Sequence, residues 1–225
     1  MTATTNDVGR IELGDNVRQM VVLQSPGSAT YAVGTLMATK AVSSTLAVAY
    51  TRAGSSTYTV AATMQKRKTL KAGAYTVTAG TLAAGIGRWT VSDPDGNTET
   101  FDTLAAADHI VFAGIGLILT VTAGGGTVWD SGDVITVTVT ADGDTVIFDP
   151  DGNGGAQTPT SIMPYEQVVA GTDMPASVIT GGKVNKDRLV IHDTTTVTDV
   201  HVQMLKDVGI FALDQEDVSM IDNVT

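Results

Sequence analysis

Apolar and polar residues alternate with a period of two in the middle of the chain. The segments 74–79 (AYTVTA), 88–92 (RWTVS) and 134–140 (VITVTVT) each place every second side chain on one face of an extended strand. The turn-forming sequence DPDG at 93–96 and glycine-rich stretches separate such segments. The pattern predicts a compact antiparallel β module in the form of a small sandwich.

Short strands are also predicted in the rest of the chain, together with one helix. The further strands are 20–23, 31–38, 45–50, 58–62, 109–112, 117–122, 145–148, 176–180 and 210–213. A helical period appears from Thr198 to Val208, where Val197, Val200, Met204 and Val208 share a face with Leu205 beside it. Thr196 or Thr198 can cap its start and Gly209 its end. We therefore predict a mostly β protein with one C-terminal helix.

The first twenty residues are polar with spaced apolar side chains, namely Val8, Ile11, Leu13 and Val17. Ile11 and Leu13 alternate with charged neighbours as they would in a strand. No long apolar partner lies within the segment. We therefore expect residues 1–20 to form an arm that is mobile in the free protein.

The charge balance narrows the classes of partner. The chain has 13 Lys and Arg against 24 Asp and Glu, a formal net charge of −11, which disfavours nucleic acid and anionic membranes. It has no cysteine, so disulfides and thiolate metal sites are excluded. We expect no secretory signal and no transmembrane segment, because the apolar run 110–121 is short and broken by glycines.

No residue pattern predicts a metal site or a catalytic group. His109, His192 and His201 lack the spacing of metal ligands, and we interpret them as structural. The pentapeptide DPDGN occurs at 93–97 and at 149–153. It resembles the start of a calcium loop but lacks the required acid at the twelfth position, so turns are the favoured interpretation. We expect no cofactor and no enzymatic activity.

Two further groups of side chains are candidates for surface contacts. Lys66, Arg67, Lys68 and Lys71 concentrate positive charge, which could dock an acidic partner or could equally belong to a solvated linker, the interpretation we favour. Trp89 and Trp129 could form a platform on which a sugar stacks, although strand tryptophans more often pack in a core.

Residues 10–40 and 142–225 resemble the head decoration proteins of tailed phages, of the phage lambda type. The similarity is carried by VGTLM at 33–37, TVIFDPDGNGGAQ at 145–157, the stretch 163–191 with Val184-Asn185, and VTDVHVQMLKDVGIFAL at 197–213. The middle of the chain resembles β modules inserted into some of these proteins. The acidic end after Leu213 and the stretch 41–70 depart from the family pattern.

The resemblance implies a small β-rich, β-clip-like core and a domain order. Residues 1–20 would be the N-terminal arm, 21–40 with 142–225 the decoration core, and 41–141 the inserted β module. Proteins of this family form trimers on the outer capsid surface and clamp neighbouring major capsid subunits. Their arm is disordered in solution and orders against the capsid protein.

Two hypotheses about function follow. The first is a homotrimer that cements the outer surface of a virion capsid, having been made in the host cytoplasm, with the major capsid protein as partner and Val8, Ile11, Leu13 and Val17 as the binding arm. The second is a glycan-binding or adhesive β-sandwich of a phage tail or cell-surface appendage. In either case the inserted module could contact a host-surface glycan.

Overall fold

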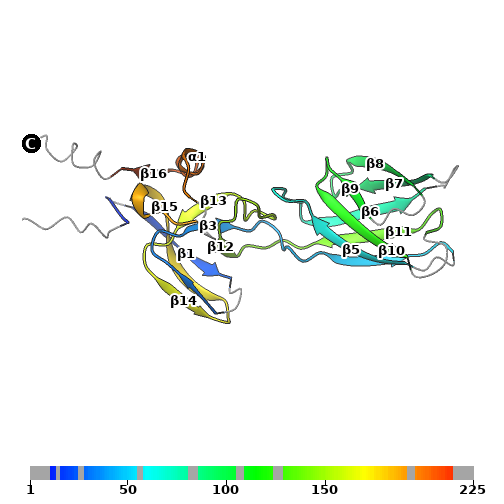
Figure 1. Cartoon of the computed structure of the whole chain (residues 1–225). Helices are drawn as coiled ribbons and strands as arrows, with labels where there is room; N and C mark the ends of the chain where they lie inside the picture. Colours follow the sequence, from blue (N-terminus) through cyan, green and yellow to red (C-terminus); the bar gives the residue numbers. More distant parts are fainter. Residues whose placement is uncertain are drawn as a thin grey trace, which may run out of the picture. The chain divides into compact units, whose positions relative to one another are not determined.

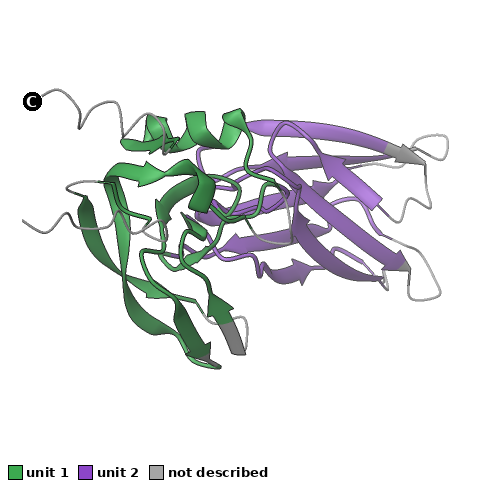
Figure 2. Ribbon diagram, turned by 60° about the vertical axis from the view of Figure 1, so that its left-hand side comes forward, with its two compact units in different colours: residues 1–40, 143–150, 156–225 green, residues 41–142, 151–155 purple. Residues whose placement is uncertain are grey.

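In the computed structural model, the described residues are 11–13, 16–24, 28–54, 58–80, 86–104, 109–123, 129–191 and 196–214. They are mostly β with a single α-helix, which confirms the predicted fold class (Figure 1). The chain divides into two compact units (Figure 2). Unit 1 comprises residues 1–40, 143–150 and 156–225, and unit 2 comprises residues 41–142 and 151–155. The chain therefore passes from one unit to the other four times.

Unit 2 is a β-sandwich whose two sheets share one apolar core. One sheet has the order β4-β11-β6-β7-β8, and the other has the order β5-β10-β9. The strands are β4 (Ala47–Thr51), β5 (Tyr58–Met64), β6 (Gly73–Ala79), β7 (Ile86–Ser92), β8 (Thr98–Leu104), β9 (His109–Phe112), β10 (Leu117–Ala123) and β11 (Val134–Val139). Both sheets contribute buried side chains to the core, among them Val77, Val137, Leu119 and Phe112.

The period-two pattern of the sequence corresponds to the buried face of this sandwich. In β11, Ile135, Val137 and Val139 are buried, while the threonines between them are half-buried or exposed. β8 was not predicted, because its sequence TETFDTL carries charged and hydroxyl side chains through most of its length. It pairs with β7 along its whole length, and Arg88 donates to both carboxylate oxygens of Asp102 at 2.7 and 2.9 Å.

Unit 1 is built on a six-stranded sheet of order β1-β12-β3-β13-β15-β16, in which β1 also pairs with β15. A separate two-stranded sheet joins β14 to β2. The strands are β1 (Val17–Leu23), β2 (Ser28–Tyr31), β3 (Leu36–Thr39), β12 (Thr145–Ile147), β13 (Pro159–Ile162), β14 (Gln167–Ala170), β15 (Met174–Asn185) and β16 (Ile210–Leu213). A 3-10 helix, η1 (Lys186–Arg188), and the helix α1 (Asp199–Asp207) complete the described elements.

The short strand β3 separates two apolar clusters of unit 1. Leu36 and Ala38 pack into one cluster with Ile179 and Leu205. Met37, on the opposite face, packs into the other. Because neighbouring side chains of a strand point to opposite faces, this strand of four residues contributes side chains to both clusters. This explains why the uninterrupted apolar run LMA is buried completely.

The predicted strand 31–38 is wrong, since a turn divides it into β2 and β3. Gly34 has φ +84°, and Thr35 N donates to the carbonyl of Ala32 at 3.2 Å. A Cβ atom at Gly34 would lie 1.8 Å from the carbonyl oxygen of Arg188. The close approach of this second segment is a tertiary contact that the local sequence does not show.

The helix α1 has the predicted ends but a different buried face. Thr198 is its N-cap and Val208 its C-cap, followed by Gly209 at φ +85°. The buried residues of α1 are His201 and Leu205, whereas Val200 is 62% exposed, which corrects the predicted apolar face. The reason is that the His201 ring packs edge-on against Phe148, with ring centroids 5.5 Å apart.

Candidate functional site

The predicted arm is wrong for the part of it that the structure describes. Ile11 is 2% exposed and lies in the apolar cluster of unit 1 that contains Leu36 and Leu205. Leu13 N donates to Lys183 O at 3.1 Å, and Asn185 N donates to Ile11 O at 2.8 Å. These partners lie far away in the sequence, so the pattern within residues 1–20 could not show them. Val8 lies outside the described residues.

Val17, the last of the predicted arm residues, begins strand β1 and is exposed. Val17, Met20 and Val22 are 63%, 65% and 47% exposed, and we call these three residues the β1 surface. Along one side, β1 pairs with β15 over its whole length. Along the other side, the only described pairing joins Leu23 to Thr145 of β12. Although β1 lies between β12 and β15, its residues 17–22 have no described strand partner on the β12 side. Exposed apolar side chains on such a strand are common at protein–protein contacts.

A hollow of about 410 Å³ lies beside the β1 surface. Met20 and Val22 line it together with hydroxyl side chains from neighbouring strands, namely Thr39, Thr145, Thr160, Ser161 and Thr180. The hydroxyls of Thr39 and Thr160 lie 3.1 Å apart within hydrogen-bonding distance. Such a wall can accept a segment that is apolar in part and that also donates hydrogen bonds.

Exposed large apolar side chains are concentrated in unit 1. Besides the β1 surface, the described examples in this unit are Tyr165, Val168, Val190, Val200, Val208 and Phe211. Among the described residues of unit 2, only Tyr50 belongs to this class. The guanidinium group of Arg52 lies over the Tyr50 ring, 4.7 Å from its centroid, and covers part of it. Unit 1 is therefore the better candidate for a contact with another protein.

The basic cluster is largely engaged within unit 2. Arg67 donates through Nε and Nη2 to Asp151 Oδ1 at 3.0 and 2.8 Å, and its backbone N donates to Gly152 O at 2.8 Å. Lys71 forms an ion pair with Asp95. Lys66 and Lys68 are exposed. These contacts support a structural role for Arg67 and Lys71. Contact of the cluster with an acidic partner remains a prediction.

Both DPDGN pentapeptides turn at their Pro-Asp pair, as predicted, but different contacts hold them. In the first, Asp93 Oδ1 accepts from Asp95 N at 3.0 Å and from Asn97 N at 2.8 Å, and Asp93 O accepts from Gly96 N at 3.0 Å. This confirms a turn, and it holds the carboxylate of Asp93 within the turn. The second pentapeptide runs from unit 1 into residues 151–155 of unit 2, where Gly154 N donates to Lys68 O at 3.1 Å.

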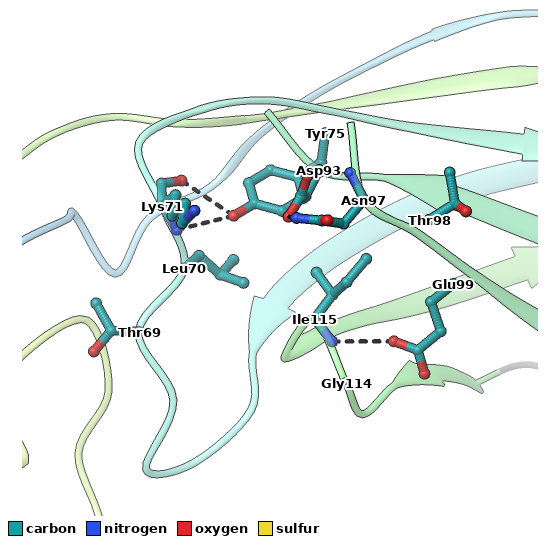
Figure 3. A pocket seen from close by; sticks show the side chains of 10 residues that line it. All are labelled: Thr69, Leu70, Lys71, Tyr75, Asp93, Asn97, Thr98, Glu99, Gly114 and Ile115. Atoms are coloured by element: carbon teal, nitrogen blue, oxygen red, sulfur yellow. Dashed lines mark hydrogen bonds between the residues drawn. The ribbon is translucent and has the colours of Figure 1, made fainter. Parts of the chain in front are cut away.

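A hollow of about 470 Å³ lies beside the first pentapeptide in unit 2 (Figure 3). The hydroxyl of Tyr75 accepts from Lys71 N at 2.9 Å and donates to Lys71 O at 3.2 Å. Glu99 Oε2 accepts from Ile115 N at 3.0 Å. The hydrogen bond from the Asn97 side chain is the main cause that lowers the pKa of Asp93. The polar groups drawn in Figure 3 therefore brace the turns that surround the hollow.

The two tryptophans do not form a platform for a sugar. Trp89 and Trp129 are 0% and 1% exposed, and their ring centroids lie 5.1 Å apart inside the core of unit 2. The interpretation that they pack in a core is confirmed. The glycan-binding hypothesis loses the two aromatic rings that suggested it.

The histidines that the structure describes have ordinary neighbours. His109 Nδ1 lies 3.4 Å from the Thr120 hydroxyl. His201 Nδ1 accepts from Thr198 N at 3.1 Å, which caps α1, and burial lowers the pKa of His201. His192 lies outside the described residues. In the described part of the chain, no three His, Asp or Glu side chains gather as a metal site would require.

The remaining observations concern membranes and known proteins. No helix within the described ranges is both long enough and apolar enough to span a bilayer. Comparison of the chain with protein-family models and with curated proteins returns no match.

Proposed function

We propose that the chain is a structural protein that binds the outer surface of a tailed-phage capsid as a homotrimer and cements neighbouring capsid subunits. The observation that carries this proposal is the concentration of exposed apolar side chains on unit 1, with the β1 surface on a strand that pairs with β12 through Leu23 alone. The sequence resemblance to head decoration proteins, which covers residues of this unit, supports the same assignment. Unit 2 is then a module carried on the capsid-bound body.

In this proposal the β1 surface, in place of the predicted N-terminal arm, contacts the major capsid protein. Ile11 is unsuitable for a contact with the capsid protein, because its side chain is already buried in unit 1. Met20 and Val22 share one face of β1, and covering their exposed parts would contribute about 2–3 kcal/mol for each protomer. This is modest beside the entropic cost of association, which is roughly 4–15 kcal/mol. Three copies on one trimer make the later contacts intramolecular, so trimerisation can make the attachment firm.

The experiment that tests this proposal combines oligomeric state with capsid binding. We expect native mass measurement to show a trimer, and co-sedimentation to show binding to expanded capsids of the tailed phage that carries the chain. Met20→Asp with Val22→Asp should abolish co-sedimentation, because two charges would enter an apolar contact. The matched control is Ala49→Asp, at an exposed position of β4 in unit 2.

Two results would contradict the proposal. A strictly monomeric protein at high concentration would remove the multivalency on which attachment depends. Undiminished co-sedimentation of the Met20→Asp, Val22→Asp variant, with the control behaving identically, would show that the β1 surface is not the contact.

A further inference from the structure

The nearly buried Lys40 of unit 1 lies against a side-chain amide. Lys40 is 9% exposed, and its Nζ lies 3.1 Å from Gln24 Oε1. The amide nitrogen of the same glutamine, Nε2, lies 3.2 Å from Asp144 Oδ2. The carboxamide of Gln24 thus contacts the Lys40 amine through its oxygen and the Asp144 carboxylate through its nitrogen.

The sheet holds these three residues together from the backbone. Gln24 directly follows β1, Lys40 directly follows β3, and Asp144 directly precedes β12, which lies between the other two strands. Gln24 N donates to Thr145 O at 2.9 Å, and Lys40 N donates to Asp144 O at 3.0 Å. Because each side chain starts from a hydrogen-bonded strand end, their approach is a property of the fold and does not depend on a mobile loop.

Lys40 is nearly buried, whereas Gln24 and Asp144 are half-buried. A hollow of about 250 Å³ adjoins Gln24 and Lys40, and its other walls include Tyr31, Val146 and Ile147. The hydroxyl of Tyr31, a residue only 1% exposed, donates to Gln24 O at 2.8 Å. The backbone from which the Gln24 side chain starts is therefore held in place beside the amine.

We propose that Lys40 and Gln24 form an intramolecular isopeptide bond, with Asp144 as the group that transfers the proton. The Lys40 ammonium passes a proton to Gln24 Oε1 while Gln24 Nε2 passes one to the Asp144 carboxylate, and the resulting amine attacks Cδ of Gln24. The bond from Cδ to Nε2 breaks while Asp144 returns the proton to the leaving nitrogen. One ammonium group and one carboxamide become a secondary amide and a free ammonium ion, so atoms and charge balance without any oxidant or cofactor.

The bond would link the end of β1 to the end of β3 across β12. It would close residues 24–40 into a covalent ring, which lies where the chain leaves unit 1 for residue 41 of unit 2. A cross-link restricts the unfolded chain and thereby stabilises the folded unit. The bond would form in the isolated chain, whether or not the chain binds a capsid.

The experiment is mass measurement on the purified full chain after denaturation. We expect a mass below that of the sequence by one molecule of ammonia. Trypsin should cut after Arg18 and Arg52 but not after Lys40, which leaves one peptide of residues 19–52 with an internal link between Gln24 and Lys40. A full-length mass equal to that of the sequence, with normal cleavage after Lys40 in the folded and incubated protein, would overturn the proposal.

Variants separate this bond from other losses of ammonia. Lys40→Arg should have the full mass expected from its sequence, and Asp144→Asn should form the bond slowly or not at all. Lys183→Arg, at an exposed lysine, should still show the loss of ammonia. Asn153-Gly154 can lose ammonia by forming a succinimide. A mass loss that maps to residue 153 and persists in Lys40→Arg would therefore count against the proposal.

Discussion

The two units have separate apolar cores, which predicts that a cavity in unit 1 leaves the stability of unit 2 unchanged. Every residue of the core of unit 2 lies within 41–142, and every residue of the two clusters of unit 1 lies outside that range. Leu205 of α1 is 0% exposed and packs in the cluster with Phe148 and Ile210. Leu205→Ala is therefore the perturbation of choice.

The magnitude follows from complete burial. Replacing a buried leucine by alanine costs the transfer energy of the lost methyl groups and leaves a cavity, so we expect unit 1 to lose about 3 kcal/mol of its free energy of unfolding. With a denaturant dependence of about 2 kcal/mol per molar urea, the midpoint of unit 1 should fall by about 1.5 M. Val200→Ala on the same helix, at a position 62% exposed, should change the free energy of unfolding by less than about 0.5 kcal/mol.

The assay uses the position of the tryptophans. Trp89 and Trp129, the two tryptophans of the chain, both lie in the core of unit 2, so tryptophan fluorescence reports the unfolding of that unit. Far-ultraviolet circular dichroism reports both units. In Leu205→Ala, the dichroism should show an early transition while the fluorescence midpoint stays at its wild-type value. A fluorescence midpoint that falls together with the dichroism would refute the separation of the two cores.

Three further predictions concern single groups. Burial lowers the pKa of His201, so the histidine binds a proton more readily in the unfolded chain than in the folded one. The free energy of unfolding should therefore fall as the pH drops below about 6.5. Denaturation measured across this pH range should show a weaker pH dependence in His201→Gln. Gly34→Ala should destabilise unit 1 by at least about 3 kcal/mol, because the new side chain would combine a positive φ with a clash against backbone. Gly143 has open space around it, so Gly143→Ala should leave thermal unfolding unchanged. Burial, followed by the Asp133 carboxylate, raises the pKa of Tyr58 to about 12. Burial also raises the pKa values of Tyr31 and Tyr75, so several tyrosines should ionise late in an absorbance titration, and Tyr58→Phe should reduce the amplitude of that late phase by one tyrosine.

Several elements could be predicted from the sequence because their determinants are local. The alternation in 134–140 gives strand β11 with Ile135, Val137 and Val139 inward, and the capping residues Thr198 and Gly209 mark the ends of α1. The first DPDGN forms the expected turn because the side chain and carbonyl of Asp93 accept hydrogen bonds from residues at most four positions away. In these cases the energy that selects the structure comes from neighbours along the chain.

Other features depend on partners that only the fold brings near. The face that α1 buries follows from Phe148, and the proposed isopeptide site joins Gln24, Lys40 and Asp144 from three strands. The second DPDGN has the same five residues as the first, yet Arg67 of unit 2 contacts its Asp151 and Gly152. A pattern along the chain carries no record of such contacts.

Local patterns in the chain are enough to predict that this protein is mostly β, where many of its strands lie and where its helix begins and ends. Tertiary structure decided which apolar residues are free to meet a partner. Ile11 and Val17 look alike in a polar leader, but Ile11 is buried against strands far along the chain while Val17 remains exposed at the start of β1. The physical reason is that secondary structure depends on local geometry and periodicity, whereas burial depends on which surfaces the folded chain brings together.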